Sequence, residues 1–162
     1  MSWLDSYTEY SDDVSEWWDE KTAGDWKELR SSIISVMQRE SRLERVVKLV
    51  GADVLPDSQR LLLEVANIFK NAFLQQNAYD EVDAFCVAEK QYRMLRIIVT
   101  FHRLASEAIK KGATLVGLRK LTVMRDIMQM KYEYPNDQAE KLDDLQKRLE
   151  ESIHELTSIV GQ

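Results

Sequence analysis

Apolar residues recur three or four positions apart along six stretches of the chain, a spacing that predicts helices rather than strands. The clearest stretch runs from Trp26 to Val50, where Asp25 is a typical N-cap and Gly51 a typical residue after a helix end. The segment 77–86 lacks a clear period and is predicted to be a loop. The other helices are predicted over 3–19, 56–76, 88–111, 114–132 and 138–160.

Residues that form tight turns are few, since the 162 residues include five Gly and two Pro. β-Sandwiches and α/β folds need many such turns, so the chain is expected to hold a few long elements. Short connections between the predicted helices favour antiparallel neighbours. We therefore predict an all-α fold, a bundle of about six helices with mostly antiparallel neighbours, in a single domain over 1–162.

Composition adds limits on the environment of this domain. Hydrophobic residues make up 44% of the chain, yet no apolar run approaches the roughly 20 residues that a membrane span needs. The one cysteine, Cys86, excludes an internal disulfide and is compatible with a reducing compartment. We expect a domain that does not insert into a membrane directly.

The charges are unevenly distributed along the chain, whose formal net charge is -6. Residues 1–20 carry seven acids and no Lys or Arg, whereas 90–125 carries nine basic residues and Glu107 as its one acid. These runs are either solvated helix faces or docking surfaces, for each other or for a partner. The sequence pI of about 5.1 argues against a general nucleic-acid binder.

Two patterns approach known chemical motifs without completing them. Gly112 to Gly117 has the spacing of a phosphate-binding loop, but Leu118 and Arg119 follow where Lys and Ser or Thr are required. Glu151 and His154 have the spacing of a di-iron ligand pair, but the second pair that such a site needs is missing. The sequence therefore predicts neither a catalytic residue nor a metal ligand in this chain.

A cluster of amide side chains lies at the end of the third predicted helix, where Gln75, Gln76 and Asn77 stand between Phe73 and Tyr79. Aromatic rings flanking amides suit the border of an aromatic ligand, because the rings stack and the amides orient it. The same residues also suit a helix end followed by a loop that aromatic side chains pack. The residues alone leave both interpretations open.

Several motifs carry a resemblance to a known family: the run from Phe73 to Tyr79, Val82-Asp83, the run from Glu89 to Leu95, the opening Trp3 to Tyr7, and Trp17-Trp18. Together they resemble the C-terminal helical domain of the catalytic A subunit of archaeal A-type and V-type rotary ATP synthases. The resemblance covers nearly the whole chain and weakens after about residue 130. Tyr79 stands where the family has Phe.

The resemblance implies that the turn after the third helix lies at the outer, adenine side of the catalytic nucleotide pocket. In this chain the implied edge consists of Phe73, Gln76, Asn77, Ala78 and Tyr79.

The resemblance also aligns the connection 51–58 with a helix-turn-helix that, in the related F-type catalytic subunit, carries an acidic loop against the rotating shaft. The two aspartates are its only acids here, so a weaker electrostatic contact with the rotor is expected. The implied rotor contact consists of Asp53, Val54, Leu55, Pro56 and Asp57.

As implied by the resemblance, the chain couples nucleotide state to the central stalk of a proton-translocating rotary ATP synthase or ATPase. The family's Walker A loop, magnesium-binding acids and catalytic glutamate belong to the preceding nucleotide-binding domain. We therefore expect no ATP turnover and no cofactor in this chain by itself, and ATP or ADP with magnesium in the full subunit. The implied partners are the preceding domain, the subunit of the central stalk and the noncatalytic B subunit, in a cytoplasmic head peripheral to the membrane.

Because the likeness begins at the first residues, we expect the chain to be a piece of a longer subunit, with Met1-Ser2 as an artificial start. The alternative hypothesis is a free-standing helical protein–protein adaptor that binds an acidic partner through a basic face at 90–125.

Overall fold

The computed structural model describes residues 11–75, 79 and 85–160, and every regular element in them is helical. The all-α prediction is therefore confirmed for this part of the chain. The elements in chain order are α1 (Ser11–Lys21), α2 (Trp26–Val50), the 3-10 helix η1 (Ala52–Val54), α3 (Asp57–Ile68), the π-helix η2 (Phe69–Leu74), α4 (Ala88–Lys110), α5 (Leu115–Arg119), α6 (Thr122–Glu133), the 3-10 helix η3 (Asn136–Gln138) and α7 (Lys141–Val160).

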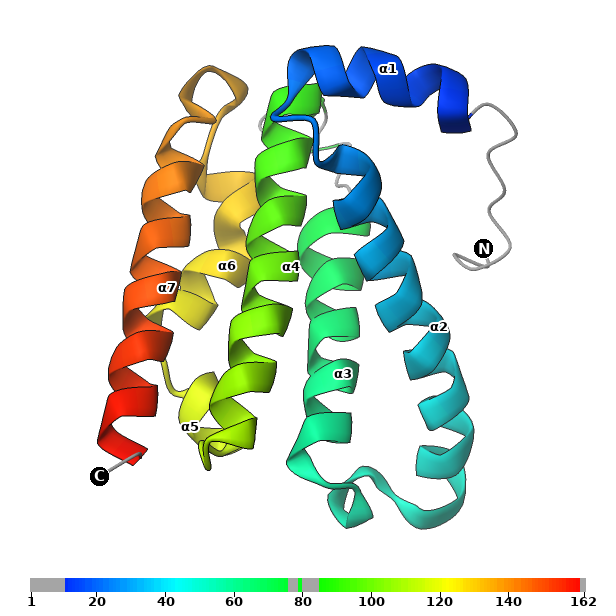
Figure 1. The fold of residues 1–162 in the computed structure, drawn as a ribbon, viewed down its shortest axis with the longest axis vertical. Coiled ribbons are helices and arrows are strands. Elements are labelled where there is room, and N and C mark those ends of the chain that lie inside the picture. Colours follow the sequence, from blue (N-terminus) through cyan, green and yellow to red (C-terminus); the bar gives the residue numbers. More distant parts are fainter. Residues whose placement is uncertain (1–10, 76–78, 80–84, 161–162) are drawn as a thin grey trace.

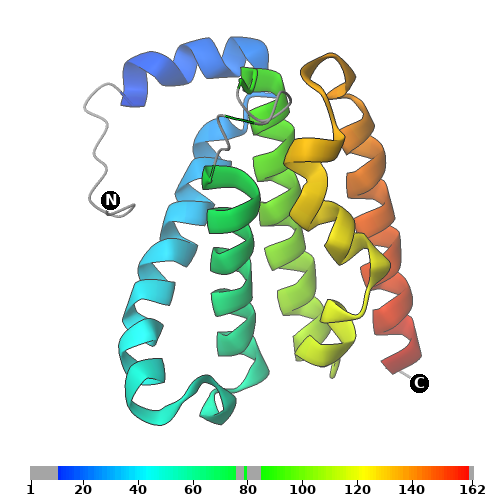
Figure 2. The ribbon, with the colours of Figure 1, turned by 180° about the vertical axis from the view of Figure 1, so that it is seen from behind.

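The helices α2, α3, α4, α6 and α7 run along the long axis of the molecule, each antiparallel to the one before it (Figure 1). The helix α4 lies in the middle, with α2 and α3 on one side and α6 and α7 on the other, as the view from behind also shows (Figure 2). The short α5 follows α4 at the lower end of the bundle, where it contacts α3 and α7. No helix among the described residues has the length and apolarity of a membrane span.

The core is built around α4, which packs against helices on both of its sides and leaves one edge exposed, at Glu89, Arg103, Glu107 and Lys110. One flank of α4 packs on α7, where four buried residues spaced three or four apart form a single face. Burying each such side chain contributes about 1.5–3 kcal/mol, so this contact is a large part of the driving force for folding. The four residues are Leu142, Leu145, Leu149 and Ile153.

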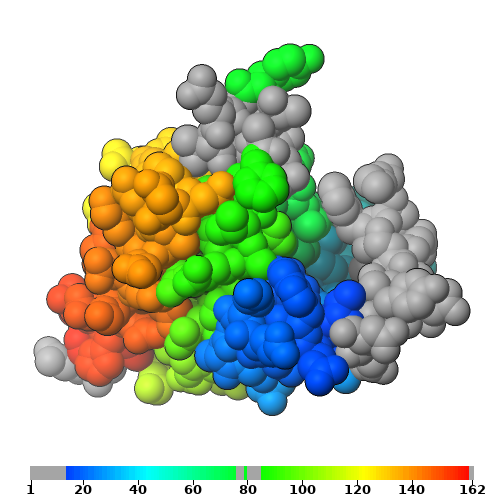
Figure 3. Space-filling model, turned by 90° about the horizontal axis from the view of Figure 1, so that it is seen from above, coloured from blue at the N-terminus to red at the C-terminus, as the bar shows by residue number. Residues whose placement is uncertain are grey.

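The helix α1 crosses the upper end of the bundle, and aromatic stacking holds it there. The ring of Trp18 stacks on that of Trp26 in α2, with centroids 5.1 Å apart and 4° between the planes. Seen from above, α1 covers one side of this end, where it contacts α2 and α4 (Figure 3). The described part of the acidic segment 1–20 therefore packs on two helices of the bundle.

The prediction that Asp25 caps α2 is wrong for its side chain, which makes no capping hydrogen bond. Its Oδ1 instead accepts a hydrogen bond of 2.6 Å from the hydroxyl of Tyr92 in α4. Burial, together with the neighbouring carboxylate, raises the pKa of Tyr92, so the phenol stays protonated and remains the donor. A buried hydroxyl needs a partner more than an accessible helix end does, since water can satisfy the latter.

The helix predicted over 114–132 is wrong as a single element, because it divides into α5 and α6. Leu115 and Leu118 of α5 are buried, and a continuous helix would next bury Thr122. The structure exposes Thr122 and buries Val123 instead. The apolar stripe slips by one position, so a break is needed for both segments to face the core.

Three further predicted helices differ from the structure in their boundaries. The helix predicted over 3–19 ends at Lys21 instead, and its residues 3–10 lie outside the described residues. The helix predicted over 56–76 begins at Asp57, becomes π-helical at Phe69 and ends at Leu74, while Gln76 lies outside the described residues. The last helix was predicted from Gln138, but it begins at Lys141, because the chain first forms the 3-10 turn η3 after a proline. The helices predicted over 26–50 and 88–111 are confirmed to within one residue.

We expect Leu145→Ala to lower the free energy of unfolding by about 2–5 kcal/mol, because Leu145 is fully buried and its truncation leaves a cavity. Leu49→Ala is a matched control, since Leu49 is 85% exposed and its truncation should change stability by less than about 0.5 kcal/mol. Urea unfolding followed by circular dichroism measures both variants. Equal losses would contradict the assignment of α7 to the core.

Candidate functional site

Phe73 of the predicted nucleotide edge and the turn of the predicted rotor contact lie at opposite ends of one helical rod. The rod is α3 followed without interruption by η2, from Asp57 to Leu74. At 1.5 Å per residue it is about 27 Å long. Its lower end is the turn between α2 and α3, and its upper end lies beside the upper half of α4 (Figure 1).

The upper end of the rod holds the first residue of the predicted nucleotide edge. Phe73 is half-buried against the core, and its ring stacks on that of Phe69 with centroids 5.1 Å apart and 17° between the planes. Tyr79, by contrast, is 99% exposed. Phe73 is therefore fixed by packing, whereas Tyr79 presents its ring outward. The other predicted members, Gln76, Asn77 and Ala78, lie outside the described residues.

Two buried lysines lie under the upper end of the rod. Lys131 donates a hydrogen bond from Nζ to the carbonyl oxygen of Gln75, and its ammonium lies 4.6 Å from the centre of the Tyr132 ring. Lys90 is fully buried and donates from Nζ to the carbonyl oxygen of Lys131 at 2.7 Å. These two carbonyls lie at the C-terminal ends of η2 and α6, where the helix leaves carbonyls unpaired and partially negative. The lysines therefore tie the two helix ends together.

These lysines are not among the residues predicted from the sequence, although the sequence contains a signal for one of them. Lys90 precedes Met94, Ile97 and Phe101 at spacings of four, three and four, so it continues an apolar stripe. A lysine on such a stripe means either that the predicted core face is wrong or that the lysine is buried with hydrogen-bond partners. Here Lys90 is buried.

A further ion pair holds the rod against α2. The ammonium of Lys70 in η2 lies 2.8 Å from Oε1 of Glu40 and 3.9 Å from a carboxylate oxygen of Glu44. Glu40 is buried, so this pair is screened by water less than a surface pair is. The upper end of the rod is thus attached to α2 as well as to α6.

The lower end of the rod is a sharp turn with an apolar surface. Gly51 follows α2 with a φ of 84°, a left-handed conformation that glycine adopts at little cost. After it come η1 and Pro56, which precedes the first residue of α3. Within the predicted rotor contact, Asp53, Val54 and Pro56 are exposed, whereas Leu55 is half-buried. Val54 is 71% exposed, so this turn presents apolar as well as acidic surface.

The two aspartates of this turn have different environments. Asp57 accepts a hydrogen bond at Oδ2 from the backbone N–H of Leu115, at 2.9 Å, and its Oδ1 lies 3.4 Å from a guanidinium nitrogen of Arg60. A second contact between α3 and α5 is the ion pair between Glu64 and Arg119, at 2.6 Å. Asp57 therefore attaches the lower end of the rod to α5, and of the two acids Asp53 is the more exposed.

The basic segment 90–125 does not form one exposed, unpaired face. Lys90 is buried, and four of the arginines form ion pairs with acids of this domain. These cations come from α4, α5 and α6 and are spread over several sides of the bundle. The surface that the adaptor hypothesis requires is therefore already partly neutralised. The four are Arg93, Arg103, Arg119 and Arg125.

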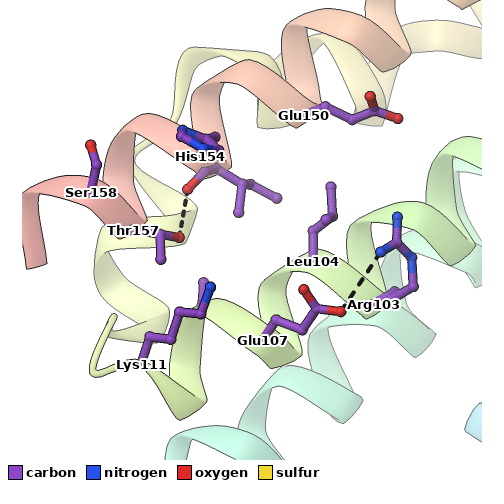
Figure 4. A pocket seen from close by; sticks show the side chains of 10 residues that line it. Arg103, Leu104, Glu107, Lys111, Glu150, His154, Thr157 and Ser158 are labelled. Atoms are coloured by element: carbon purple, nitrogen blue, oxygen red, sulfur yellow. Dashed lines mark hydrogen bonds and ion pairs between the residues drawn. The ribbon is translucent and has the colours of Figure 1, made fainter. Parts of the chain in front are cut away.

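A groove of about 540 Å³ runs between the C-terminal halves of α4 and α7 (Figure 4). On its α4 side Arg103 pairs with Glu107 at 3.7 Å, and on its α7 side Thr157 donates to the carbonyl oxygen of Ile153 at 2.7 Å. Because these polar groups already have partners within their own helices, they are poorly placed to orient a ligand. The groove lies at the lower end of the bundle and does not include Phe73 or Tyr79.

Comparison with known proteins bears directly on this arrangement. The C-terminal domain of V and A type ATP synthase matches residues 15–117 of the chain. The chain belongs to this family. The matched residues include both ends of the rod, so the family resemblance inferred from the motifs is confirmed.

Individual relatives agree with the family. The A subunit of the A-type ATP synthase of Methanopyrus kandleri is 48% identical over 157 residues, which are 96% of this chain and 26% of that protein. The corresponding protein of Hyperthermus butylicus is 41% identical over 158 residues, with the same shares. The V-type ATP synthase alpha chain of Halothermothrix orenii is 42% identical over 156 residues. The chain spans about a quarter of the length of these relatives.

We expect Asp57→Ala to lower the free energy of unfolding by about 1–3 kcal/mol, because it leaves the N–H of the buried Leu115 without its acceptor. Asp57→Asn keeps an oxygen acceptor and should retain most of that stability. Asp53→Ala is the matched control from the same turn and should stay within about 0.5 kcal/mol of the parent. Urea unfolding gives the three values, and a larger loss for Asp53→Ala than for Asp57→Ala would refute this division of roles.

Proposed function

We propose that this domain is a helical lever in the catalytic subunit of a proton-translocating rotary ATP synthase or ATPase. It borders the adenine side of the nucleotide site and couples the nucleotide state to the central stalk. One observation carries the proposal: Phe73 of the implied nucleotide edge and the turn implied for the rotor contact lie at opposite ends of a single rod, α3 with η2. A displacement at one end of a continuous helix reaches the other end without passing through a loop.

The attachments of the rod determine how such a lever would move. Lys131 and Lys70 hold its upper end to α6 and α2, and Asp57 holds its lower end to α5. Sliding the rod within the bundle would break all three contacts at once. The domain therefore tilts as one body, and the bend is absorbed outside it.

The contribution of this chain to the nucleotide site is an edge rather than a catalytic group. ATP or ADP with magnesium binds in the full subunit. The catalytic states differ in which nucleotide is bound. Phe73 offers a ring fixed by the core and Tyr79 an exposed ring, with Gln76, Asn77 and Ala78 between them in sequence. The phosphate-binding and catalytic groups belong to the preceding domain, so the chain by itself turns over no ATP.

The partners follow from the proposed place in the complex. The relatives are named as an A-type subunit or an alpha chain of an ATP synthase, which supports assembly with other subunits. The domain contacts the preceding nucleotide-binding domain, the central stalk and the noncatalytic B subunit. Its location is the cytoplasmic head, peripheral to the membrane.

Tyr79→Ala in the full subunit should weaken nucleotide binding about two- to tenfold, the value of one aromatic contact. Tyr79→Phe is the matched control and should leave the affinity unchanged, because it keeps the ring. Titration of the assembled catalytic sites with a fluorescent ATP analogue measures both variants. An unchanged affinity for Tyr79→Ala would remove this residue from the nucleotide edge.

A cysteine at the lower turn should crosslink to the central stalk. Val54→Cys suits this test because Val54 is 71% exposed and lies in η1, and Cys86→Ser removes the background thiol. Gln129→Cys, at an exposed position of α6, is the control that should not react with the stalk. If Val54→Cys forms no stalk crosslink in any nucleotide state, the lower turn is not the rotor contact.

A further inference from the structure

The outward side of α2 carries a row of exposed residues that the proposed rotor contact does not include. Arg39, Arg42, Arg45, Val46 and Leu49 are all exposed, and their spacing of mostly three residues places them on one side of the helix. We call these five residues the α2 stripe. Basic residues occupy its upper part, and apolar residues lead to the lower turn.

The arginines of the α2 stripe differ from those of the basic segment 90–125. None of the three forms an ion pair within the described part of the chain. The nearby acids Glu40 and Glu44 lie toward Lys70 on the rod side of α2. The α2 stripe is therefore a local positive surface on a chain of net charge -6.

A neighbouring titratable group also experiences this positive charge. Burial, followed by the charge of Arg39, lowers the pKa of His102 in α4. Arg39 therefore lies close enough to His102 to act on it as a cation.

The lower part of the α2 stripe is continuous with the turn at the end of the rod. Leu49 is 85% exposed, and the neighbouring Val50 and Val54 are exposed as well. A group of large apolar side chains left in water at one end of a soluble bundle is typical of a protein-binding surface. A partner therefore has to present apolar residues to the lower part of the α2 stripe and acidic residues to the arginines above it.

We propose that the α2 stripe binds an acidic helical face of the same partner chain that the lower turn contacts. Carboxylates of that face pair with Arg39, Arg42 and Arg45, and its apolar residues cover Val46 and Leu49. This inference rests on the proposed lever function and makes it more specific. The contact is opposite in sign to an acidic loop pressed against a basic shaft.

Charge complementarity favours this occupant over a second copy of the chain. In a two-fold symmetric dimer the same patch meets itself, so the arginines of one copy would meet either the arginines or the apolar residues of the other, and neither arrangement supplies a carboxylate. Arginines brought into contact with each other repel, because they carry the same charge. An acidic partner turns the same three charges into attractive contacts and raises the rate of association.

The test is the binding of this chain to the purified central-stalk subunit. Fluorescence anisotropy measures the affinity at 50 mM and at 300 mM NaCl. The double variant Arg42→Glu/Arg45→Glu should weaken binding at least about tenfold at 50 mM, and most of the salt dependence should disappear. Its control is Arg103→Glu/Arg125→Glu, at arginines that are paired within the domain, with an expected change below about twofold. Leu49→Ser should weaken binding about tenfold at both salt concentrations, whereas Ile159→Ser, at a residue 72% exposed on α7, should not.

The outcomes separate this inference from the lever function. Unchanged affinity in Arg42→Glu/Arg45→Glu overturns the α2 stripe, even if the Val54→Cys crosslink forms and the lever function stands. As a second measurement, Arg45→Cys in the assembled complex should crosslink to the stalk in the Cys86→Ser background. Absence of this crosslink overturns the proposal, and absence of both crosslinks overturns the lever function too.

Two other occupants would also overturn it. If Arg42→Glu/Arg45→Glu abolishes self-association in sedimentation but not stalk binding, the α2 stripe pairs two copies of this chain. If the chain binds phosphatidylserine vesicles through these arginines and the stalk not at all, the α2 stripe faces a lipid surface.

Discussion

The burial of α4 is the constraint on which the rest of the structure depends. This helix contacts α1, α2, α3, α6, α7 and η2, so each of these elements takes its position from a face of α4. The small residues Ala105 and Ala108 are buried, which lets neighbouring helices approach its lower half closely. A helix packed on several sides cannot shift without opening the core, because protein interiors contain few voids. The packing around α4 therefore opposes movement of one helix relative to the others.

Charged side chains on backbone groups complete this rigidity at the two ends of the α3–η2 rod. At the upper end the ammonium of Lys131 meets a carbonyl at the C-terminus of η2, and at the lower end the carboxylate of Asp57 meets an amide at the start of α5. Cations suit helix C-termini and anions suit helix N-termini, since the helix dipole has those signs. Apolar packing fixes where the rod lies, and these polar contacts fix its ends against sliding along its axis.

The fold class was predictable because it depends on local signals. The period of the apolar residues located α2 and α4 to within one residue, and Gly51 marked the end of α2. What failed depended on tertiary contacts. The slip of the apolar stripe between Leu118 and Val123 and the use of Asp25 by Tyr92 are visible only when the partner helices are in place.

The candidate site shows the same division. Sequence motifs singled out both ends of the rod, but they gave no reason to distinguish Asp57 from Asp53 or to notice Lys131. A hydrogen bond from α5 distinguishes the aspartates, and the fold brings Lys131 to Gln75 across 56 residues of sequence. Charge counting had a similar limit. It selected 90–125, where four of the five arginines form ion pairs with acids of this domain, and passed over α2, where Arg39, Arg42 and Arg45 form none within the described residues. Because a paired arginine must give up one carboxylate to accept another, the unpaired arginines of α2 are the stronger candidates for binding an acidic partner.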